Sequence, residues 1–420
     1  MLAFSNDYYG FIFRATQSVE LFCAYAQRDT GLWIVISKNN YEIVNMCVYE
    51  EKFDEYYKTL NDREQEYFCD LVKCLTKMKA LVLQKDVNVR NVSIVTLEIT
   101  NSCNLQCKHC CQNAKLSKGK LDVSYDSLKA YIDKVLVLNP ETIAITGGEP
   151  LIRPDFEKLV KYIRNRYSKK LVLMTNGTLV TKEKSEFISE YFDSVEISLD
   201  GVDEETCSKV RGKGVYNHVV KAIGLLQKSG MNKITISMVE TKDNMKFEDS
   251  FFALNKKLGT KGILRPLSIS GRVNENPQII PDSYSTIKIP PKVIIREDEV
   301  EVAKKELAYR RCPAGDRSIY LSHEGFMYPC GAFVEQEYLL GNIDDWNMET
   351  DLFEDMIYTS QGYRNLKKLL PEENDKCKKC NVSKFCYNCI SSYCKDSSCM
   401  NFGEFCDTRK EALQELVWGS

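Results

Sequence analysis

The sequence predicts an α/β fold in which six parallel strands alternate with helices. Short β-branched apolar runs recur along residues 93–266, and amphipathic helical segments separate them. The chain also holds 18 cysteines, crowded at two places. Six βα units are fewer than the eight of a closed barrel, so we expect a partial (β/α)6 TIM-like barrel followed by a cysteine-rich region. A doubly wound open sheet is the alternative.

The expected strands span 93–99, 142–146, 170–175, 194–199, 233–239 and 262–266. The expected helices begin near Ser124, Asp155, Thr181, Tyr216 and Phe247. Ser124, Asp155 and Thr181 are good N-cap residues, and Gly230 and Gly259 are typical helix ends. Because parallel strands share one C-terminal edge, we expect the chemistry at that edge.

The remaining segments divide the chain into four predicted parts. Residues 1–90 suit a small α+β, winged-helix-like domain, in which 33–37 and 41–48 are expected strands around a turn at 38–40. A helix capped near Asn61 or Asp62 follows. Residues 91–275 form the barrel, the proline-rich stretch 276–305 is a linker, and 306–420 is the cysteine-rich domain.

Composition excludes several partners. Charged residues make up 28% and the formal net charge is -2, which gives no electrostatic footprint for nucleic acid. The N-terminus lacks the pattern of a signal peptide, and no apolar run is long enough to span a bilayer. We therefore expect a cytoplasmic protein without a membrane partner. In that compartment, crowded cysteines bind metal more often than they form disulfides.

One cysteine group follows the first expected barrel strand, in "LEITNSCNLQCKHCC". Cys103, Cys107 and Cys110 are spaced C-x3-C-x2-C, and Cys111 lies outside this spacing. Three thiolates can hold three irons of a [4Fe–4S] cluster and leave the fourth iron open. A structural zinc site with His109 as a fourth ligand is the alternative. Five scattered cysteines are expected to be buried small side chains: Cys23, Cys47, Cys69, Cys74 and Cys207.

"CNLQCKHC" resembles the signature of the radical S-adenosylmethionine (SAM) enzymes. The resemblance implies that Cys103, Cys107 and Cys110 ligate a [4Fe–4S] cluster whose open iron is chelated by SAM. It extends over "ITGGEP", "MTNG", "VEISLDG" and "VRGKG", each near the end of an expected strand. It implies SAM contacts by Gly147, Gly148, Glu149, Pro150, Asn176, Ser198, Asp200, Arg211 and Asn244. Glu149 is the implied partner of the methionyl amino group, and Arg211 of the SAM carboxylate.

The second cysteine group resembles the SPASM extension of radical SAM enzymes, which binds two auxiliary [4Fe–4S] clusters. Its cysteines are Cys312, Cys330, Cys377, Cys380, Cys386, Cys389, Cys394, Cys399 and Cys406. By the order of the motif, Cys377, Cys380, Cys386 and Cys406 hold the outer cluster. Cys312, Cys330 and Cys389 hold the inner one. Cys389 stands one position early, so Cys394 or Cys399 are open alternatives, and zinc is the alternative metal.

These resemblances imply reductive cleavage of SAM to a 5′-deoxyadenosyl radical that abstracts hydrogen from a ribosomally synthesised peptide. A thioether or carbon–carbon crosslink is the expected product. The implied partners are that precursor peptide, whose leader the N-terminal domain is expected to bind, and an electron donor such as flavodoxin or ferredoxin. The alternatives are a sulfatase-maturating, formylglycine-forming enzyme and a non-catalytic iron–sulfur or zinc scaffold. The sequence identifies no acid–base residue, and His218 and His323 are expected to be structural.

Overall fold

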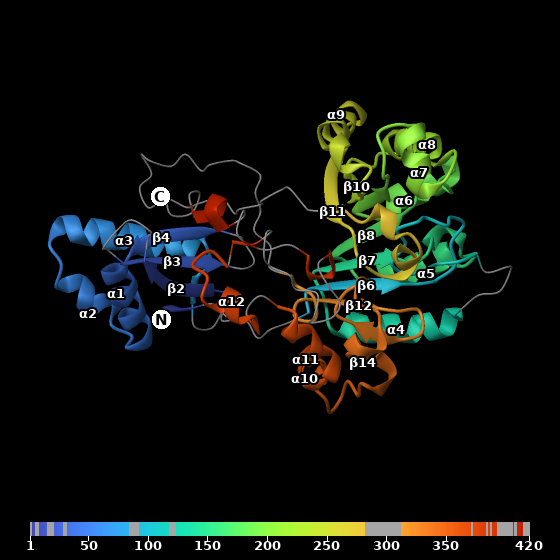
Figure 1. The fold of residues 1–420 in the computed structure, drawn as a ribbon. Coiled ribbons are helices and arrows are strands. Elements are labelled where there is room, and N and C mark those ends of the chain that lie inside the picture. The colour runs from blue at the N-terminus through green and yellow to red at the C-terminus, as the bar shows by residue number, and fades with distance from the viewer. Residues whose placement is uncertain are drawn as a thin grey trace.

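The computed structural model describes the chain over residues 2–4, 8–14, 21–27, 32–83, 92–116, 123–281, 312–370, 373–383, 385–386, 389–392, 406 and 410–414. Within this part, no helix is both long and apolar enough to cross a membrane. Figure 1 shows the barrel strands and their helices on one side and the N-terminal helices at the opposite end. Two separate hydrophobic cores correspond to these two regions.

The six expected barrel strands are all present and parallel. They are β6 (Ile94–Glu98), β7 (Thr142–Thr146), β8 (Lys170–Thr175), β9 (Ser194–Ser198), β10 (Ile234–Glu240) and β11 (Lys261–Pro266). In the sheet they lie side by side in chain order, from β6 to β11. A doubly wound sheet reverses its strand order at a switch point, so this order argues for the partial barrel.

Helices cover one face of this sheet. They are α4 (Tyr125–Val137), α5 (Phe156–Arg164), α6 (Lys182–Tyr191), α7 (Glu204–Arg211), α8 (Val215–Lys228) and α9 (Glu248–Leu258). Val95 and Leu97 of β6 pack in the same core as Leu128 of α4 and Leu159 of α5. Since side chains alternate along a strand, Thr96 and Glu98 point to the opposite face.

Most of these helices begin and end near the residues that the sequence predicts. Ser124 and Thr181 cap α4 and α6 through their side chains, and Gly259 ends α9 in the left-handed conformation. Asp155 precedes α5 but does not cap it, because its carboxylate pairs with the Arg153 guanidinium at 2.8 Å. The sequence did not predict α7. This helix has only eight residues, and few of them are apolar, so it leaves no periodic signal.

The N-terminal region contains two small sheets and three helices. Strands β2 (Tyr8–Arg14), β3 (Leu21–Gln27) and β4 (Trp33–Ser37) form an antiparallel sheet, and β1 (Leu2–Phe4) pairs with β5 (Leu81–Leu83). The helices are α1 (Lys38–Tyr49), α2 (Phe53–Lys58) and α3 (Asp62–Lys77). Asn61 caps α3 with a capping box, as the sequence predicts.

The expected second strand at 41–48 is wrong, because α1 occupies these residues. The Ser37 side chain accepts a hydrogen bond from the Asn40 N–H and starts the helix where a turn was expected. Val44, Cys47 and Val48 are buried on one face at helical spacing. The β-branched residues of this segment favoured a strand locally, but burial of that face against the N-terminal core favours the helix.

The C-terminal region adds strands to the barrel sheet, which the sequence did not predict. Strand β12 (Ser318–Leu321) pairs in parallel with β6, and β13 (Phe326–Tyr328) and β14 (Gly341–Asn342) follow antiparallel. Helices α10 (Phe353–Thr359), α11 (Gln361–Lys368) and α12 (Asp375–Lys378) come next. Strands this short carry little sequence pattern. Of the predicted linker 276–305, residues 282–305 lie outside the described residues.

The N-terminal sheet contacts the cysteine-rich segment. Trp33 of β4 is 2% exposed, and its ring lies edge-on to that of Phe385, with centroids 4.8 Å apart. Val382 and Leu413 complete this small core, and Cys380 packs against it. Figure 1 accordingly shows α12 between the N-terminal strands and the barrel.

Candidate active site

The three predicted cluster cysteines lie in the loop that follows β6, at the C-terminal edge of the parallel strands. Cys103 and Cys107 are buried, Cys110 is half-buried, and all three are free thiols. Burial raises the pKa of Cys103 to about 11 and also raises the pKa of Cys107. Buried thiolates need a cation or a metal to compensate their charge. Three free thiols in one loop, two of them buried, therefore fit an iron–sulfur cluster.

The turn after β7 lies directly against this loop. The Gly148 N–H donates to the Thr100 carbonyl at 2.8 Å, and the Glu149 N–H donates to the Ser102 carbonyl at 2.9 Å. A Cβ atom on Gly147 would lie 2.4 Å from the Thr100 oxygen, and one on Gly148 would lie 2.4 Å from the Ser102 oxygen. The glycines thus allow the two backbones to meet. Their contact with SAM stays a prediction.

The Glu149 side chain is fully buried and joins the ends of β7 and β8. Its carboxylate accepts hydrogen bonds from the Thr175 hydroxyl (2.7 Å) and from the N–H groups of Asn176 (2.7 Å) and Leu151 (3.1 Å). Burial raises the pKa of Glu149, and these three donors oppose the shift. Pro150 begins the next 3-10 turn. Glu149 therefore holds the strand ends in place, and its role as partner of the methionyl amino group remains a prediction.

The Asn176 side chain points at the cysteine loop. Its Nδ2 donates to the Asn104 side chain at 2.9 Å and lies 3.9 Å from the Cys103 sulfur. Its Oδ1 accepts from the N–H and the hydroxyl of Thr178. The structure thus brings the end of β8 to the first predicted cluster ligand.

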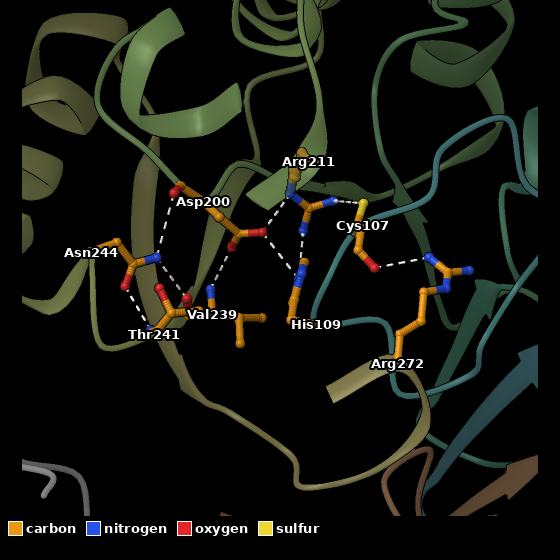
Figure 2. A network of polar contacts seen from close by, with 8 residues as sticks. All are labelled: Cys107, His109, Asp200, Arg211, Val239, Thr241, Asn244 and Arg272. Atoms are coloured by element: carbon orange, nitrogen blue, oxygen red, sulfur yellow. Dashed lines mark hydrogen bonds and ion pairs between the residues drawn. The ribbon is translucent and has the colours of Figure 1, made fainter. Parts of the chain in front are cut away.

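Asp200, Arg211 and His109 form the centre of a buried polar network (Figure 2). Arg211 Nε lies 2.6 Å from Asp200 Oδ2, and His109 Nε2 lies 3.0 Å from the same oxygen. Burial would raise the pKa of Asp200, but the Arg211 guanidinium and then His109 outweigh it and hold that pKa well below its usual range. Arg211 Nη1 also lies 3.8 Å from the Cys107 sulfur. The predicted carboxylate-binding arginine thus already has a carboxylate partner and touches the cluster loop.

Asn244 uses its side chain to bind backbone. Its Nδ2 donates to the Val239 carbonyl at 2.8 Å, and its Oδ1 accepts from the Thr241 N–H at 2.7 Å. Ser198 lies at the end of β9, in register with Ser237 of β10. Its predicted contact with SAM and that of Asn244 stay predictions.

Two buried polar atoms of this network have neither a hydrogen-bond partner nor an ion-pair partner among the residues that the structure describes. They are His109 Nδ1 and Thr241 Oγ1. Buried polar atoms are rarely left unsatisfied without a functional reason or an absent ligand. Their presence beside Asp200 and the cysteine loop fits a polar ligand such as SAM. His109 Nε2 is engaged by Asp200, so His109 has only Nδ1 left for any other contact.

A second polar cluster, which the sequence did not reveal, joins β6 to β12. His323 Nδ1 lies 3.2 Å from Glu98 Oε1, and both side chains are mostly buried. Burial, followed by the charge of the nearby Glu98 carboxylate, raises the pKa of Tyr320 well above its ordinary value. Glu98 is the last residue of the first barrel strand. The rule that functional residues lie at the C-terminal ends of barrel strands could therefore have identified Glu98 from the sequence.

The structure brings some auxiliary cysteines together. Cys330 is half-buried, and burial followed by the charges of Cys312 and Cys389 raises its pKa well above the ordinary value. These three are the predicted ligands of the inner cluster. Cys377 lies in α12, and Cys380 and Cys386 pack against the small core that contains Phe385. Cys394 and Cys399 lie outside the described residues. The assignment of each cysteine to a cluster stays a prediction.

Two protein-family models match the chain. The radical SAM superfamily model matches residues 97–253, and the SPASM iron–sulfur cluster-binding domain model matches residues 312–381. The first range begins in β6 and includes the cysteine loop. The second includes Cys312, Cys330, Cys377 and Cys380.

Curated relatives match over about two thirds of the chain. Mycofactocin maturase MftC of Mycolicibacterium smegmatis is 29% identical over 304 residues, 68% of this chain and 74% of that protein. An AdoMet-dependent heme synthase of Methanosarcina barkeri is 28% identical over 70% of this chain and 90% of that protein. The subtilosin biosynthesis protein AlbA of Bacillus subtilis is 28% identical over 70% of this chain and 66% of that protein.

Solved structures share the fold. A structure of anSMEcpe with bound AdoMet has a TM-score of 0.55 at 19% identity and covers 77% of this chain and 96% of that chain. Streptococcus suis SuiB bound to its precursor peptide SuiA has a TM-score of 0.53 at 15% identity and covers 95% of this chain and 100% of that one. The parallel sheet, its cysteine loop and both family matches agree, and they imply that the protein binds SAM and iron–sulfur clusters. The chain is an enzyme that contains a radical SAM domain over residues 97–253 and a SPASM iron–sulfur cluster-binding domain over residues 312–381.

Proposed function

We propose that this enzyme matures a ribosomally synthesised peptide by forming a thioether or carbon–carbon crosslink. The cluster held by Cys103, Cys107 and Cys110, with SAM bound, supplies a 5′-deoxyadenosyl radical that abstracts hydrogen from the peptide. Flavodoxin or ferredoxin is the proposed electron donor. Relatives that support the proposal are the mycofactocin maturase and the subtilosin biosynthesis protein, which match 68% and 70% of this chain.

In this proposal the chain's own residues position SAM. Arg211 Nε is held by Asp200, Nη1 faces Cys107, and Nη2 lies 3.4 Å from His109 Nε2. Arg211 would therefore orient the SAM carboxylate through the second N–H of Nη1 or Nη2. His109 offers its unpartnered Nδ1 as a polar contact and its ring as a flat surface. The turn at Gly147 and Gly148, seated on the cysteine loop, fixes the cluster relative to the strand ends.

Two further [4Fe–4S] clusters are proposed in the SPASM domain, three in the whole enzyme. Cys312, Cys330 and Cys389 hold the inner cluster, and Cys377, Cys380, Cys386 and Cys406 hold the outer one. The charges of Cys312 and Cys389 act on Cys330, and Cys312 and Cys330 pack against the same small core, which supports the first group. A two-electron oxidation of the peptide releases one hydrogen atom, one electron and one proton. The hydrogen atom would go to the deoxyadenosyl group, the electron to an auxiliary cluster and the proton to solvent.

The observation that carries the peptide assignment is the position of the N-terminal sheet. Strands β2 and β4 each pair only with β3 among the described residues, so each has an edge that could accept another strand. The sheet is attached to the cysteine-rich segment through Trp33 and Phe385. A leader bound at such an edge would deliver the rest of the peptide toward the barrel. We accordingly propose that residues 1–90 recognise the leader, with 91–275, 276–305 and 306–420 as barrel, linker and auxiliary-cluster domain.

The heme synthases favour a second candidate function, since one of them is matched over 90% of its length. The substrate of this chain would then be a tetrapyrrole. The leader-binding sheet would have no purpose in that reaction. A sulfatase-maturating enzyme is the third candidate, with a cysteine or serine of a sulfatase as its target.

The test uses the full chain, purified and reconstituted without oxygen. Iron content near twelve per chain and formation of 5′-deoxyadenosine from SAM with dithionite would establish radical SAM activity. The reconstituted enzyme is then incubated separately with short peptides encoded beside its gene, with a sulfatase peptide that contains cysteine, and with an iron porphyrin precursor. Mass spectrometry should detect the loss of two hydrogens from a neighbouring peptide. If the enzyme modifies the porphyrin or the sulfatase peptide and leaves the neighbouring peptides unchanged, the proposal is overturned.

A matched control separates leader recognition from chemistry. The neighbouring peptide is tested whole and with its N-terminal half deleted. We expect the whole peptide to be modified much faster than the truncated one. The difference should persist when the truncated peptide is supplied at saturating concentration without free leader. Equal rates for both forms would contradict the role proposed for residues 1–90.

A further inference from the structure

Arg272 is a residue without a predicted role that the structure places against the cysteine loop. It lies in the 3-10 turn Gly271–Glu275, shortly after β11, and is only 9% exposed. Its side chain extends to residues 107–114, which precede it by more than 150 positions. Figure 2 shows its guanidinium next to Cys107, on the opposite side from Arg211.

Four hydrogen bonds join Arg272 to this loop. Nη1 donates to the Cys107 carbonyl at 2.8 Å, Nε donates to the Asn113 side chain at 3.2 Å, and Nη2 donates to the Ala114 carbonyl. The Arg272 backbone N–H donates to the Cys110 carbonyl at 3.0 Å. One side chain thus spans the loop from its second predicted cluster ligand to its end.

The neighbouring Gly271 makes this approach possible. Its φ is +57°, and a Cβ there would lie 2.4 Å from the Cys110 carbonyl oxygen and 2.5 Å from that of Cys111. The end of the barrel is therefore in backbone contact with the cysteine loop. Together with the turn at Gly147 and Gly148, it encloses the loop from two sides.

The charge of Arg272 is the unusual feature. Its three side-chain acceptors are two backbone carbonyls and one amide, all neutral, and no carboxylate among the described residues pairs with it. Arg211, in contrast, has Asp200 as its counter-ion. An arginine stays protonated when buried, and an uncompensated buried charge is strongly unfavourable. Among the influences on the pKa of Cys107, burial raises it most, while Arg211 and Arg272 lower it.

We propose that Arg272 is the counter-cation of the cluster on Cys103, Cys107 and Cys110, holding the loop in place and favouring the reduced cluster. Reduction adds one negative charge to a thiolate-bound cluster. A nearby buried cation stabilises that charge and raises the reduction potential. Arg272 is therefore a positioning residue: it acts on electron transfer to SAM through the cluster and its loop, and not by contact with SAM. The inference rests on the radical SAM domain of the chain and is independent of its peptide substrate.

The test compares charge and hydrogen bonding in full-length, reconstituted protein. The electron paramagnetic resonance signal that changes on addition of SAM identifies this cluster, and a redox titration gives its midpoint potential. We expect Arg272→Gln to lower the potential and Arg272→Lys, which keeps the charge, to stay close to the wild-type value. Lys108→Gln is the matched control. This variant also removes one positive charge beside Cys107, but from an exposed side chain whose charge is screened by water and salt. The midpoint potential of the cluster should therefore stay at the wild-type value.

Two results would overturn the proposal. One is a wild-type potential in Arg272→Gln. The other is an equal shift in Lys108→Gln, which would mean that any cation on the loop has this effect. If Arg272→Gln retains too little iron to titrate, the iron content of Arg272→Lys decides. A wild-type iron content in Arg272→Lys would support the role of the charge. An iron content as low as that of Arg272→Gln would mean that Arg272 acts only through its hydrogen bonds, which would overturn the proposal.

Discussion

Arg211 and Asp200 form a buried ion pair in which the Nε and Oδ2 atoms are 2.6 Å apart. Asp200 follows the end of β9 by two residues, and Arg211 is the last residue of α7. His109 of the cysteine loop contacts the same carboxylate oxygen. This pair therefore connects the fourth barrel strand, a short helix that the sequence did not predict, and the cluster loop. It also means that Asp200 already partly compensates the charge of Arg211.

Breaking this pair should be costly. Asp200→Asn leaves the Arg211 guanidinium buried without a counter-ion, and we expect it to destabilise the protein by about 3–5 kcal/mol. Urea unfolding of the iron-free protein at neutral pH measures the change. Asp203→Asn, at an exposed cap of α7, is the control and should cost less than about 0.5 kcal/mol, because asparagine caps a helix about as well as aspartate. A loss below about 1 kcal/mol for Asp200→Asn would mean that water reaches the pair.

Gly148→Ala should disturb the cysteine loop. The added Cβ would lie 2.4 Å from the Ser102 oxygen, so the turn after β7 must move away from the loop. We expect loss of the SAM-responsive cluster signal and of the corresponding iron. Gly224→Ala in α8 is the control, since its Cβ meets nothing within 4 Å. It should stabilise the helix by up to about 1 kcal/mol. Full iron retention in Gly148→Ala would contradict the close contact.

The N-terminal core should show a pH dependence from its buried thiols. Burial raises the pKa of Cys74 to about 11. Because the folded-state pKa lies above the unfolded one, the contribution to stability is complete below the unfolded value, near 9.0, and is lost as pH rises through about 11. Cys74→Ala should therefore lessen the alkaline fall in the urea midpoint. Cys69→Ala, at a more exposed position on α3, is the control. Identical alkaline curves for wild type and Cys74→Ala would show that this thiol does not ionise on unfolding.

Trp33 and Phe385 should be energetically coupled. Each ring is almost fully buried, so Trp33→Ala should destabilise by about 3–5 kcal/mol. In a double-mutant cycle the edge-on ring pair should contribute about 0.5–1.5 kcal/mol of coupling. Limited proteolysis should then cut the cysteine-rich segment more readily in either single variant. Strict additivity of the two changes would indicate that the N-terminal sheet and this segment are not in contact in solution.

Local sequence patterns predicted the barrel well, for physical reasons. Strands β7 and β8 begin and end at the expected residues, because apolar β-branched runs between turn residues have few alternatives. The same reasoning failed at 41–48, where β-branched residues occur in a helix whose buried face depends on the rest of the N-terminal core. It also missed β12, a four-residue strand that is stable only because β6 offers it an edge.

The sequence by itself determined the order of strands and helices, the spacing of Cys103, Cys107 and Cys110, and their place at the C-terminal edge. These features depend on neighbours within a few positions, and short-range periodicity records them. Only the tertiary structure decided that Arg211 pairs with Asp200, that Glu98 meets His323, and that Arg272 closes over a loop more than 150 residues earlier. Such contacts depend on how the strands pack and on which buried charges need a partner. Nothing in the local spacing of those residues encodes them.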